Sequence, residues 1–90
     1  MYKIIYAKEA EEGLSKLKNS EPSSFNKAVK LLKEIAIHPK TGTGHPEPLK
    51  GTPNNRWSRR ISKKHRVVYR IFETEVYVYI LSSYGHYDDK

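Results

Sequence analysis

The sequence predicts an α+β domain in which an N-terminal strand and two helices pack on a twisted antiparallel sheet. Apolar side chains recur at helical spacing over much of the first 37 residues. Three runs rich in β-branched and aromatic residues follow between residues 56 and 82, and such runs are typical of strands. Helices that precede a group of strands favour α+β over an alternating α/β fold. With 90 residues, no internal repeat and no linker, the chain is expected to form one domain, residues 1–90.

One strand and one helix are expected first. The run Tyr2–Tyr6 is β-branched and aromatic, which favours a strand. The following residues predict a helix over Lys8–Lys18, which Gly13 weakens by roughly 1 kcal/mol relative to alanine. The apolar positions that recur at helical spacing are Ala7, Ala10, Leu14 and Leu17.

A second helix is expected to end near Ile37. Either Ser23 or Ser24 caps its N-terminus, or Pro22 lies in its first turn. Pro39 stops it, because the residue before a proline disfavours the helical conformation. The apolar stripe of this helix consists of Phe25, Ala28, Val29, Leu32, Ile35 and Ala36. Two such helices would cover one face of the sheet and leave the other face to solvent or a ligand.

A loop over residues 38–55 follows, and its composition suggests a function. It holds four of the five prolines and three of the five glycines. Loops of this length in a small domain are more often functional than idle. Pro46 and Pro48 restrain Glu47 to an extended conformation, and Leu49 is expected to hold the loop against the core.

The remaining strands are expected at Arg56–Ile61, His65–Phe72 and Val76–Ser82. If residues 62–64 form a three-residue turn, Arg60 lies directly across from Arg66. The same register turns Trp57, Ile61, Val67, Tyr69 and Ile71 toward the helices. A turn of two or four residues would shift the pairing.

The arginines of this hairpin favour an anionic partner. Residues 56–71 carry five arginines and no carboxylate. Like charges directly opposite each other on a sheet are destabilising unless an anion or a carboxylate lies between them. Guanidinium groups bind phosphate bidentately and stay charged at any working pH. The alternative is a pair of solvated arginines on an exposed face.

The overall composition limits the chemistry. The net charge of +7, from 17 Lys and Arg against 10 Asp and Glu, favours RNA, DNA or an acidic protein as a partner, or serves solubility alone. The chain has no cysteine, so it has no disulfide, thiolate metal site or cysteine nucleophile. None of the four histidines has a metal-ligand spacing, so neither a metal nor another cofactor is expected. With no signal peptide and no membrane-spanning run, a cytoplasmic protein is expected.

Glu47, His86 and the clustered arginines together fit metal-free RNA cleavage. One group takes the proton of the ribose 2′-OH, another protonates the leaving 5′-oxygen, and arginines stabilise the charge of the phosphorane. A histidine near the C-terminus is suited to proton transfer, although such a residue also occurs simply at the surface. His38 and His45 are expected in the loop and His65 in the turn of the hairpin.

Four motifs in series resemble the YoeB/Txe toxins of the RelE superfamily. They are His45-Pro46-Glu47-Pro48-Leu49-Lys50, Trp57-Ser58-Arg59-Arg60-Ile61, His65-Arg66-Val67-Val68-Tyr69 and Gly85-His86-Tyr87. The resemblance spans nearly the whole chain. It implies a RelE-like fold and the toxin of a type II toxin–antitoxin system, a ribosome-dependent endoribonuclease that cleaves mRNA in the A site and inhibits translation.

The resemblance also implies a role for each motif residue. Glu47 is similar to the general base, His86 to the general acid and Arg66 to the main transition-state stabiliser. Lys50 and Arg60 would hold phosphates, and Tyr87 would help to place the substrate. The family's best-known members end in Arg-Tyr-His-Tyr, whereas this chain has Tyr84-Gly85-His86-Tyr87 followed by three further residues. This difference bears most on Tyr87.

The implied partners are a YefM-like antitoxin, the ribosome and its mRNA, and operator DNA reached only through the antitoxin complex. A homodimer is also implied, and a membrane is not. Two alternatives use the same scaffold without catalysis. One is a gyrase inhibitor similar to the ParE toxins, which lack this acid–base set, and the other is a basic RNA-binding module.

Overall fold

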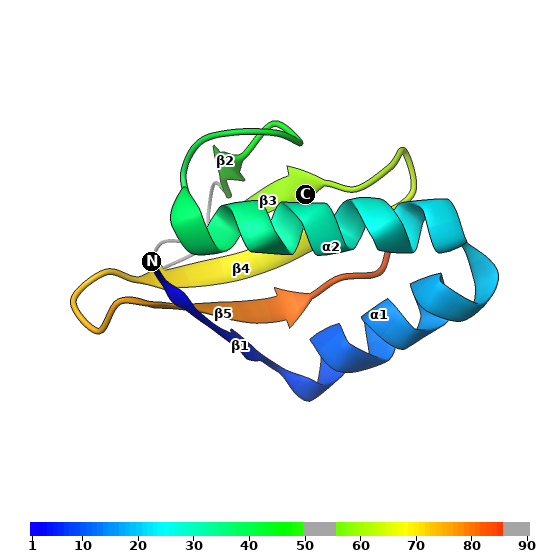
Figure 1. Ribbon diagram of the computed structural model, residues 1–90, viewed down its shortest axis with the longest axis horizontal. Coiled ribbons are helices and arrows are strands. Elements are labelled where there is room, and N and C mark those ends of the chain that lie inside the picture. Colours follow the sequence, from blue (N-terminus) through cyan, green and yellow to red (C-terminus); the bar gives the residue numbers. More distant parts are fainter. Residues whose placement is uncertain (50–55, 86–90) are drawn as a thin grey trace.

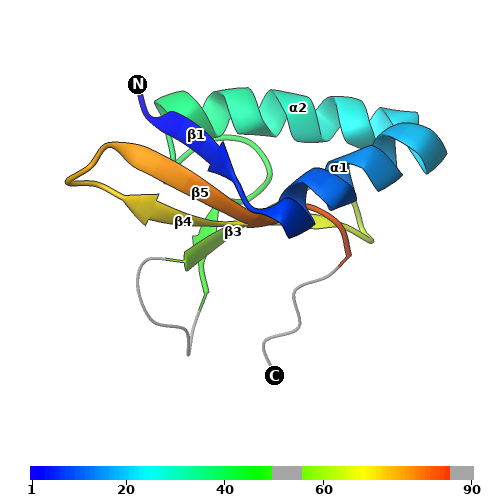
Figure 2. The same ribbon diagram turned by 90° about the horizontal axis from the view of Figure 1, so that it is seen from below.

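The computed structural model describes residues 1–49 and 56–85 and forms two layers, a sheet covered on one face by two helices (Figures 1 and 2). In Figure 2, α1 and α2 both lie above the sheet. The α+β class is therefore confirmed. The elements are β1 (Lys3–Tyr6), α1 (Lys8–Ser20), α2 (Pro22–Ile37), β2 (Glu47–Pro48), β3 (Arg56–Arg60), β4 (Arg66–Phe72) and β5 (Tyr77–Ser82).

The sheet is mixed, whereas a wholly antiparallel one was expected. Its strand order is β1-β5-β4-β3-β2, and β1 pairs with β5 in parallel while the other neighbours are antiparallel. Parallel neighbours need a long connection, and here most of the chain lies between the two strands. The amides of Lys3 and Ala7 extend this pairing by donating to the carbonyls of Val76 and Ile80, at 3.2 and 2.9 Å.

The second helix begins at Pro22, so of the two alternatives Pro22 in the first turn is confirmed and a serine cap is wrong. Glu21 occupies the N-cap position without a side-chain capping bond, and Ser23 and Ser24 are already inside the helix. Proline suits the first helical position because its φ is fixed near the helical value and its missing N–H would have no partner there. The helix ends at Ile37 as expected, two residues before Pro39.

The core lies between the helices and the sheet. The strand residues predicted to face the helices are almost completely buried, with Ile61, Val67, Tyr69 and Ile71 at most 2% exposed, and Trp57 packs beside them. From the other layer the core receives Ala10, Leu17, Ala28, Leu31, Leu32 and Ile35.

Gly13 has a packing function that its low helix propensity does not suggest. A Cβ at this position would lie 2.7 Å from Ser83 Oγ and 2.9 Å from Tyr84 Cβ. The buried Ser83 hydroxyl donates to the carbonyl of Ala10 at 2.7 Å. The glycine therefore lets the residues after β5 lie directly on α1.

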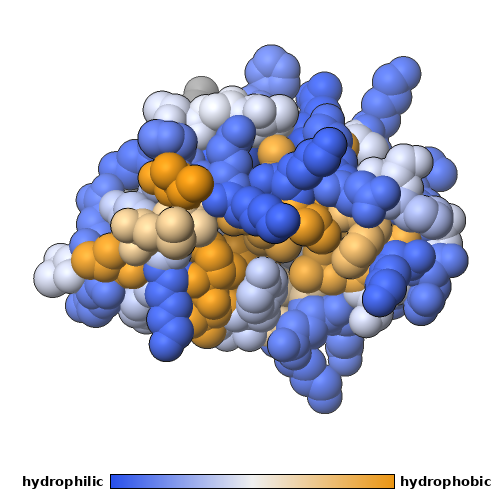
Figure 3. All heavy atoms as spheres, viewed as in Figure 1, coloured by the Kyte–Doolittle hydropathy of each residue, from blue (hydrophilic) through white to orange (hydrophobic). Residues whose placement is uncertain are grey.

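An apolar groove of about 330 Å³ opens between β1, α1 and α2. Figure 3 shows hydrophobic surface between α2 and the β1–α1 edge. The groove is lined by Ile4, Tyr6, Leu14, Phe25, Val29, Leu32, Lys33 and Ala36.

Among the described residues, no helix is long and apolar enough to cross a membrane.

Candidate functional site

The predicted register of the β3–β4 hairpin is confirmed. Arg60 pairs with Arg66, Ser58 with Val68 and Arg56 with Arg70. Directly paired residues point to the same face of a sheet, and alternate residues along a strand return to it. Four arginines of the hairpin therefore share the face that the helices leave uncovered: Arg56, Arg60, Arg66 and Arg70.

Glu47 joins this face through β2. Its two-residue strand pairs antiparallel with β3, placing Glu47 opposite Ser58, and the Leu49 amide adds a 2.9 Å bond to the Arg56 carbonyl. The loop is thus fixed as an edge strand at the point where the two prolines favour extended backbone. Leu49 is half-buried but lies outside the main core cluster.

Glu47 and Arg66 meet on this face. Glu47 Oε1 lies 3.5 Å from Arg66 Nη1, which also donates to Ser58 Oγ at 3.4 Å. The Glu47 side chain is 57% exposed and that of Arg66 is 19% exposed. The carboxylate therefore offsets part of the repulsion between Arg66 and the facing Arg60, yet both groups remain accessible to a ligand.

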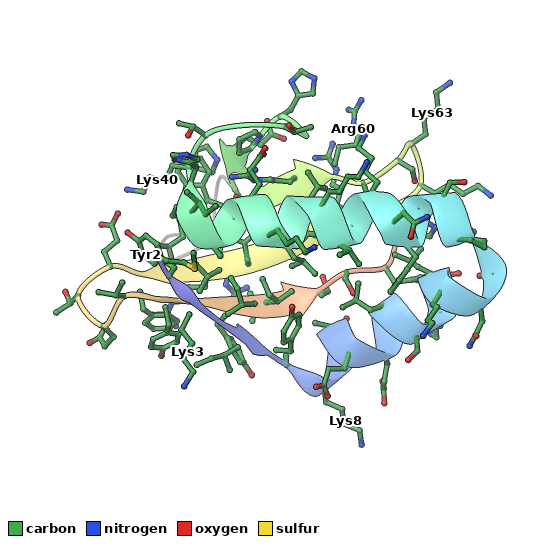
Figure 4. The ribbon with its side chains drawn as sticks, viewed as in Figure 1. Tyr2, Lys3, Lys8, Lys40, Arg60 and Lys63 are labelled. Atoms are coloured by element: carbon green, nitrogen blue, oxygen red, sulfur yellow. The ribbon has the colours of Figure 1, made fainter. Side chains whose placement is uncertain are left out.

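Arg60 is exposed at the end of β3. Figure 4 shows its side chain projecting outward beyond α2, on the same edge of the molecule as Lys63. Its backbone N–H donates to the Gly44 carbonyl at 2.7 Å, which holds the loop before Glu47 against β3. A cavity of about 310 Å³ adjoins the same sheet face, with Arg56, Val68 and Tyr79 in its lining.

Arg59, the next residue along the strand, has a different environment that the sequence interpretation missed. It faces the helices and is completely buried. Nε donates to the Tyr69 hydroxyl at 3.1 Å and Nη1 to Glu34 Oε1 at 2.6 Å. The remaining donors reach loop carbonyls: Thr43 at 3.3 Å, Thr41 at 2.7 Å, and His38.

Two partners of Arg59, Glu34 and Tyr69, have shifted pKa values. Hydrogen bonding from the Thr43 amide, together with the Arg59 charge, lowers the pKa of Glu34. Burial raises the pKa of Tyr69, whose hydroxyl donates to the Pro39 carbonyl at 2.8 Å. Arg59 therefore ties α2, β4 and the loop 38–43 together, and this loop leads to Glu47.

His65 does not lie in the turn of the hairpin, where it was expected. It follows the turn, is 3% exposed, and binds Glu21 and Gly85 through its two ring nitrogens. The Arg66 amide donates to the Gly85 carbonyl at 3.0 Å. The described chain thus ends beside the residue that contacts Glu47.

Three of the predicted site residues, Lys50, His86 and Tyr87, lie outside the described residues. The structure brings the other three, Glu47, Arg60 and Arg66, onto one face. Within residues 1–49 and 56–85 there is no group of three or more acidic or histidine side chains arranged to hold a metal. A carboxylate, two guanidinium groups and an open sheet face can bind a phosphodiester and accept a proton near it.

The sequence matches a known protein family. The model for YoeB-like toxins of bacterial type II toxin–antitoxin systems matches residues 6–87. Toxin YoeB of Mycobacterium bovis is 43% identical over 57 residues, covering 63% of this chain and 67% of that protein. Toxin YoeB of Escherichia coli K12 is 30% identical over 76 residues, covering 84% and 90%.

Solved structures show the same fold. The YoeB/ParE toxin from Agrobacterium tumefaciens superposes with a TM-score of 0.86 at 28% identity, covering 94% of this chain and 99% of that one. The YoeB dimer from Staphylococcus aureus gives 0.83 at 30% identity, covering 96% and 98%. The toxin in the YoeB–YefM complex of the same species gives 0.80 at 30% identity, covering 97% and 99%.

Proposed function

Because this chain belongs to the family of YoeB-like toxins of bacterial type II toxin–antitoxin systems, we propose that it is a ribosome-dependent endoribonuclease that cleaves mRNA in the A site. The observation that carries the proposal is the meeting of Glu47 and Arg66 on the sheet face that the helices leave open, with Arg60 across from Arg66. A proton acceptor beside a phosphate-binding group is what metal-free cleavage of RNA requires.

In the proposed reaction the ribose 2′-oxygen attacks the adjacent phosphorus. Glu47 takes the 2′-OH proton as the new P–O bond forms. The bond from phosphorus to the 5′-oxygen then breaks, and His86 gives that oxygen its proton. The products are a 2′,3′-cyclic phosphate and a 5′-hydroxyl, so the atoms balance without water, a metal or a cofactor.

Arg66 would stabilise the charge that builds up on the phosphorane. Its contact with Glu47, at 3.5 Å, is longer than a strong charge-assisted hydrogen bond and involves a carboxylate that is 57% exposed. An incoming phosphate can therefore take over the guanidinium without leaving a buried carboxylate unpaired. Arg60 and Lys50 would hold flanking phosphates, and Tyr87 would help to place the nucleotide.

Ribosome dependence is consistent with the open geometry of the site. Glu47 and Arg60 are both exposed, so the described part of the site does not by itself immobilise a flexible RNA strand. A ribosome-bound mRNA is already ordered, which reduces the entropic cost of reaching the reactive geometry. The net charge of +7 favours approach to ribosomal RNA, and this attraction weakens with salt.

We also infer an antitoxin partner and a toxin dimer, each from a relative. The S. aureus YoeB is known in complex with YefM and as a dimer, and both superpose on nearly the whole of this chain. A YefM-like protein would neutralise this toxin, and the complex would reach operator DNA through the antitoxin. Because the proposed reaction takes place on translating ribosomes, we expect the protein to act in the cytoplasm.

Primer extension on mRNA translated in a cell extract tests the proposal. The wild type should produce cuts within codons on ribosome-bound message, and His86→Ala should abolish them. His38→Ala, which removes another histidine ring from the exposed C-cap position of α2, is the matched control and should cut normally.

Three results would overturn the proposal. Equal cleavage of ribosome-free RNA would remove the ribosome dependence. Absence of cuts, together with trapped DNA breaks in a parallel gyrase assay, would instead favour a ParE-like inhibitor, a class that the name of the A. tumefaciens relative also includes. Binding with steep salt dependence but no cleaved product would identify an RNA-binding module.

A further inference from the structure

The imidazole ring of His65 makes two hydrogen bonds, and together they determine which ring nitrogen carries the proton. The Gly85 amide is a donor only, and it lies 2.9 Å from Nδ1. Nδ1 must therefore be the unprotonated acceptor, so the proton of the neutral ring is on Nε2. That nitrogen lies 2.8 Å from Glu21 Oε2, an acceptor that matches this assignment.

Both polar backbone groups of Gly85 form hydrogen bonds to residues at the start of β4. Its N–H donates to His65, and its carbonyl accepts the Arg66 amide at 3.0 Å. Gly85 has a φ of +81°, in the left-handed region where glycine carries no Cβ penalty. This conformation lets one residue contact both His65 and Arg66, which are neighbours at the start of β4.

The residues before Gly85 are attached to the same place. The rings of Tyr84 and His65 lie 4.5 Å apart between centroids, and Lys16 Nζ lies 5.2 Å from the centre of the Tyr84 ring. Ser83 is bound to the Ala10 carbonyl on α1, where Gly13 provides the space. Segments near a chain terminus are usually poorly ordered unless they are tied down, and here each of residues 83–85 has a defined contact.

Glu21 connects His65 to the start of the second helix. It is the N-cap residue of α2, 44 positions before His65 in the sequence, and its carboxylate side chain is 31% exposed. Through the imidazole, the start of α2 is connected to the segment after β5. The buried His65 is thus the link between the rigid helical layer and the last described residue of the chain.

We propose that His65 is a positioning residue that fixes the segment 83–85 against the start of β4, and thereby fixes the point from which the chain continues to His86. The inference rests on the proposed function for the role of His86. His65 is only 3% exposed, so it is assigned no direct contact with the substrate. It acts by holding Gly85, the residue before His86 in the sequence, against the Arg66 backbone.

Two matched substitutions separate the two bonds of the imidazole. The polar group of an asparagine side chain can occupy the position of Nδ1, so His65→Asn keeps an acceptor for the Gly85 amide and loses the Glu21 contact. The longer glutamine places its amide near Nε2, so His65→Gln keeps a donor to Glu21 and loses the acceptor for Gly85. Both variants replace a neutral ring by a neutral amide.

The proposal predicts that the two variants cleave mRNA at different rates, and that this difference does not follow their unfolding temperatures. In single-turnover cleavage of mRNA on programmed ribosomes, His65→Gln should lower the maximal rate by about 10- to 100-fold with little change in the concentration of toxin needed for half-maximal rate. His65→Asn should retain most of the rate. A merely structural histidine would make both rates follow the unfolding temperature, which is measured on the same samples.

The wild-type protein supplies a second test that needs no variant. In its complex with antitoxin or alone, the ¹⁵N spectrum of His65 should show an unprotonated Nδ1 and a protonated Nε2. The Gly85 amide should exchange with solvent more slowly than the same amide in an unfolded chain, and His65→Gln should remove that protection. A protonated Nδ1, or an unprotected Gly85 amide, overturns the proposal even if a variant does not fold.

These measurements also distinguish failure of this inference from failure of the proposed function. If the wild type cleaves mRNA and His65→Gln cleaves equally fast, the positioning role is wrong and the nuclease assignment stands. If the wild type does not cleave at all, the nuclease assignment fails, while the spectrum and the exchange rate still decide whether His65 holds Gly85.

Discussion

Arg59 and Arg60 are adjacent in the sequence and have opposite environments. Arg59 points to the helices, is completely buried, and donates to Tyr69, Glu34 and loop carbonyls. Arg60 points to the open face and is exposed, with Arg66 as its cross-strand neighbour. The alternation of side chains along a strand is the whole cause of this difference.

The comparison shows that a cluster of arginines cannot be assigned to a ligand by its charge alone. Arg59 contributes a buried cation that organises protein groups, and removing it would leave several of them without partners. Arg60 and Arg66 contribute cations whose partners are solvent or an exposed carboxylate. Three predictions follow from the buried side of this comparison, and a fourth from the open side.

The largest effect is expected from Arg59→Met. The substitution keeps much of the buried volume but removes the hydrogen bonds that Arg59 donates to Glu34, the Tyr69 hydroxyl and the loop carbonyls. Each buried group that loses its hydrogen bond costs about 1–3 kcal/mol, so the loss of several bonds removes a large part of the stability of a small protein. Urea unfolding followed by circular dichroism measures the change.

Arg60→Met is the matched control for this substitution. It removes the same charge from the next residue, on the exposed side, and should change the free energy of unfolding by no more than about 0.5 kcal/mol. Equal destabilisation by the two substitutions would show that the buried Arg59 and the exposed Arg60 do not differ in their contribution to stability.

A smaller effect is expected from Tyr69→Phe, because the hydroxyl joins Arg59 to the Pro39 carbonyl without contributing to the charge of the cluster. Loss of a buried hydrogen-bonding group costs about 1–3 kcal/mol. Thermal unfolding should show a lower midpoint, and amide exchange should increase in the loop 38–43. A loop as protected as in the wild type would argue against its attachment through Tyr69.

The smallest of the three effects concerns acid. The pKa of Glu34 is lowered in the folded protein from its ordinary value of 4.5, mainly by the Thr43 amide. Its stabilisation is therefore fully present above the unfolded value and is lost as the pH falls through the lower folded value. Glu34→Gln should be less stable than the wild type at neutral pH.

The same variant should also lose less stability than the wild type on acidification from about pH 6 to about pH 3. Urea midpoints at several pH values measure the slope for both proteins. Equal slopes for the two proteins would mean that the contacts with Thr43 and Arg59 do not lower the pKa of Glu34 in the folded protein.

Much of the fold was predictable because it depends on local patterns. Helical spacing indicated both helices, and the three-residue turn indicated the register that pairs Arg60 with Arg66. The parallel pairing of β1 with β5 was not predictable from the residues, because it joins strands more than 70 positions apart. Pro22 in place of a serine cap was one of two alternatives that the sequence left open.

The site was predictable in part for the same reason. Glu47 and Arg66 were identified from their motifs, but their ion pair depends on β2 joining the edge of the sheet. The burial of Arg59 had a signal, since alternation from Trp57 and Ile61 places it on the helical face. His65 had none, because its partners, Glu21 and Gly85, lie 44 and 20 positions away.

The central claim is that the open face of the hairpin carries function without carrying stability. The most direct test is Arg66→Ala, measured both by unfolding and by single-turnover cleavage of mRNA on programmed ribosomes. Its side chain contributes a partly exposed ion pair, so the free energy of unfolding should change by no more than about 1 kcal/mol. Cleavage should slow by about 10²- to 10³-fold, the cost of removing a transition-state donor. Cleavage at the wild-type rate, or a loss explained entirely by unfolding, would contradict the claim.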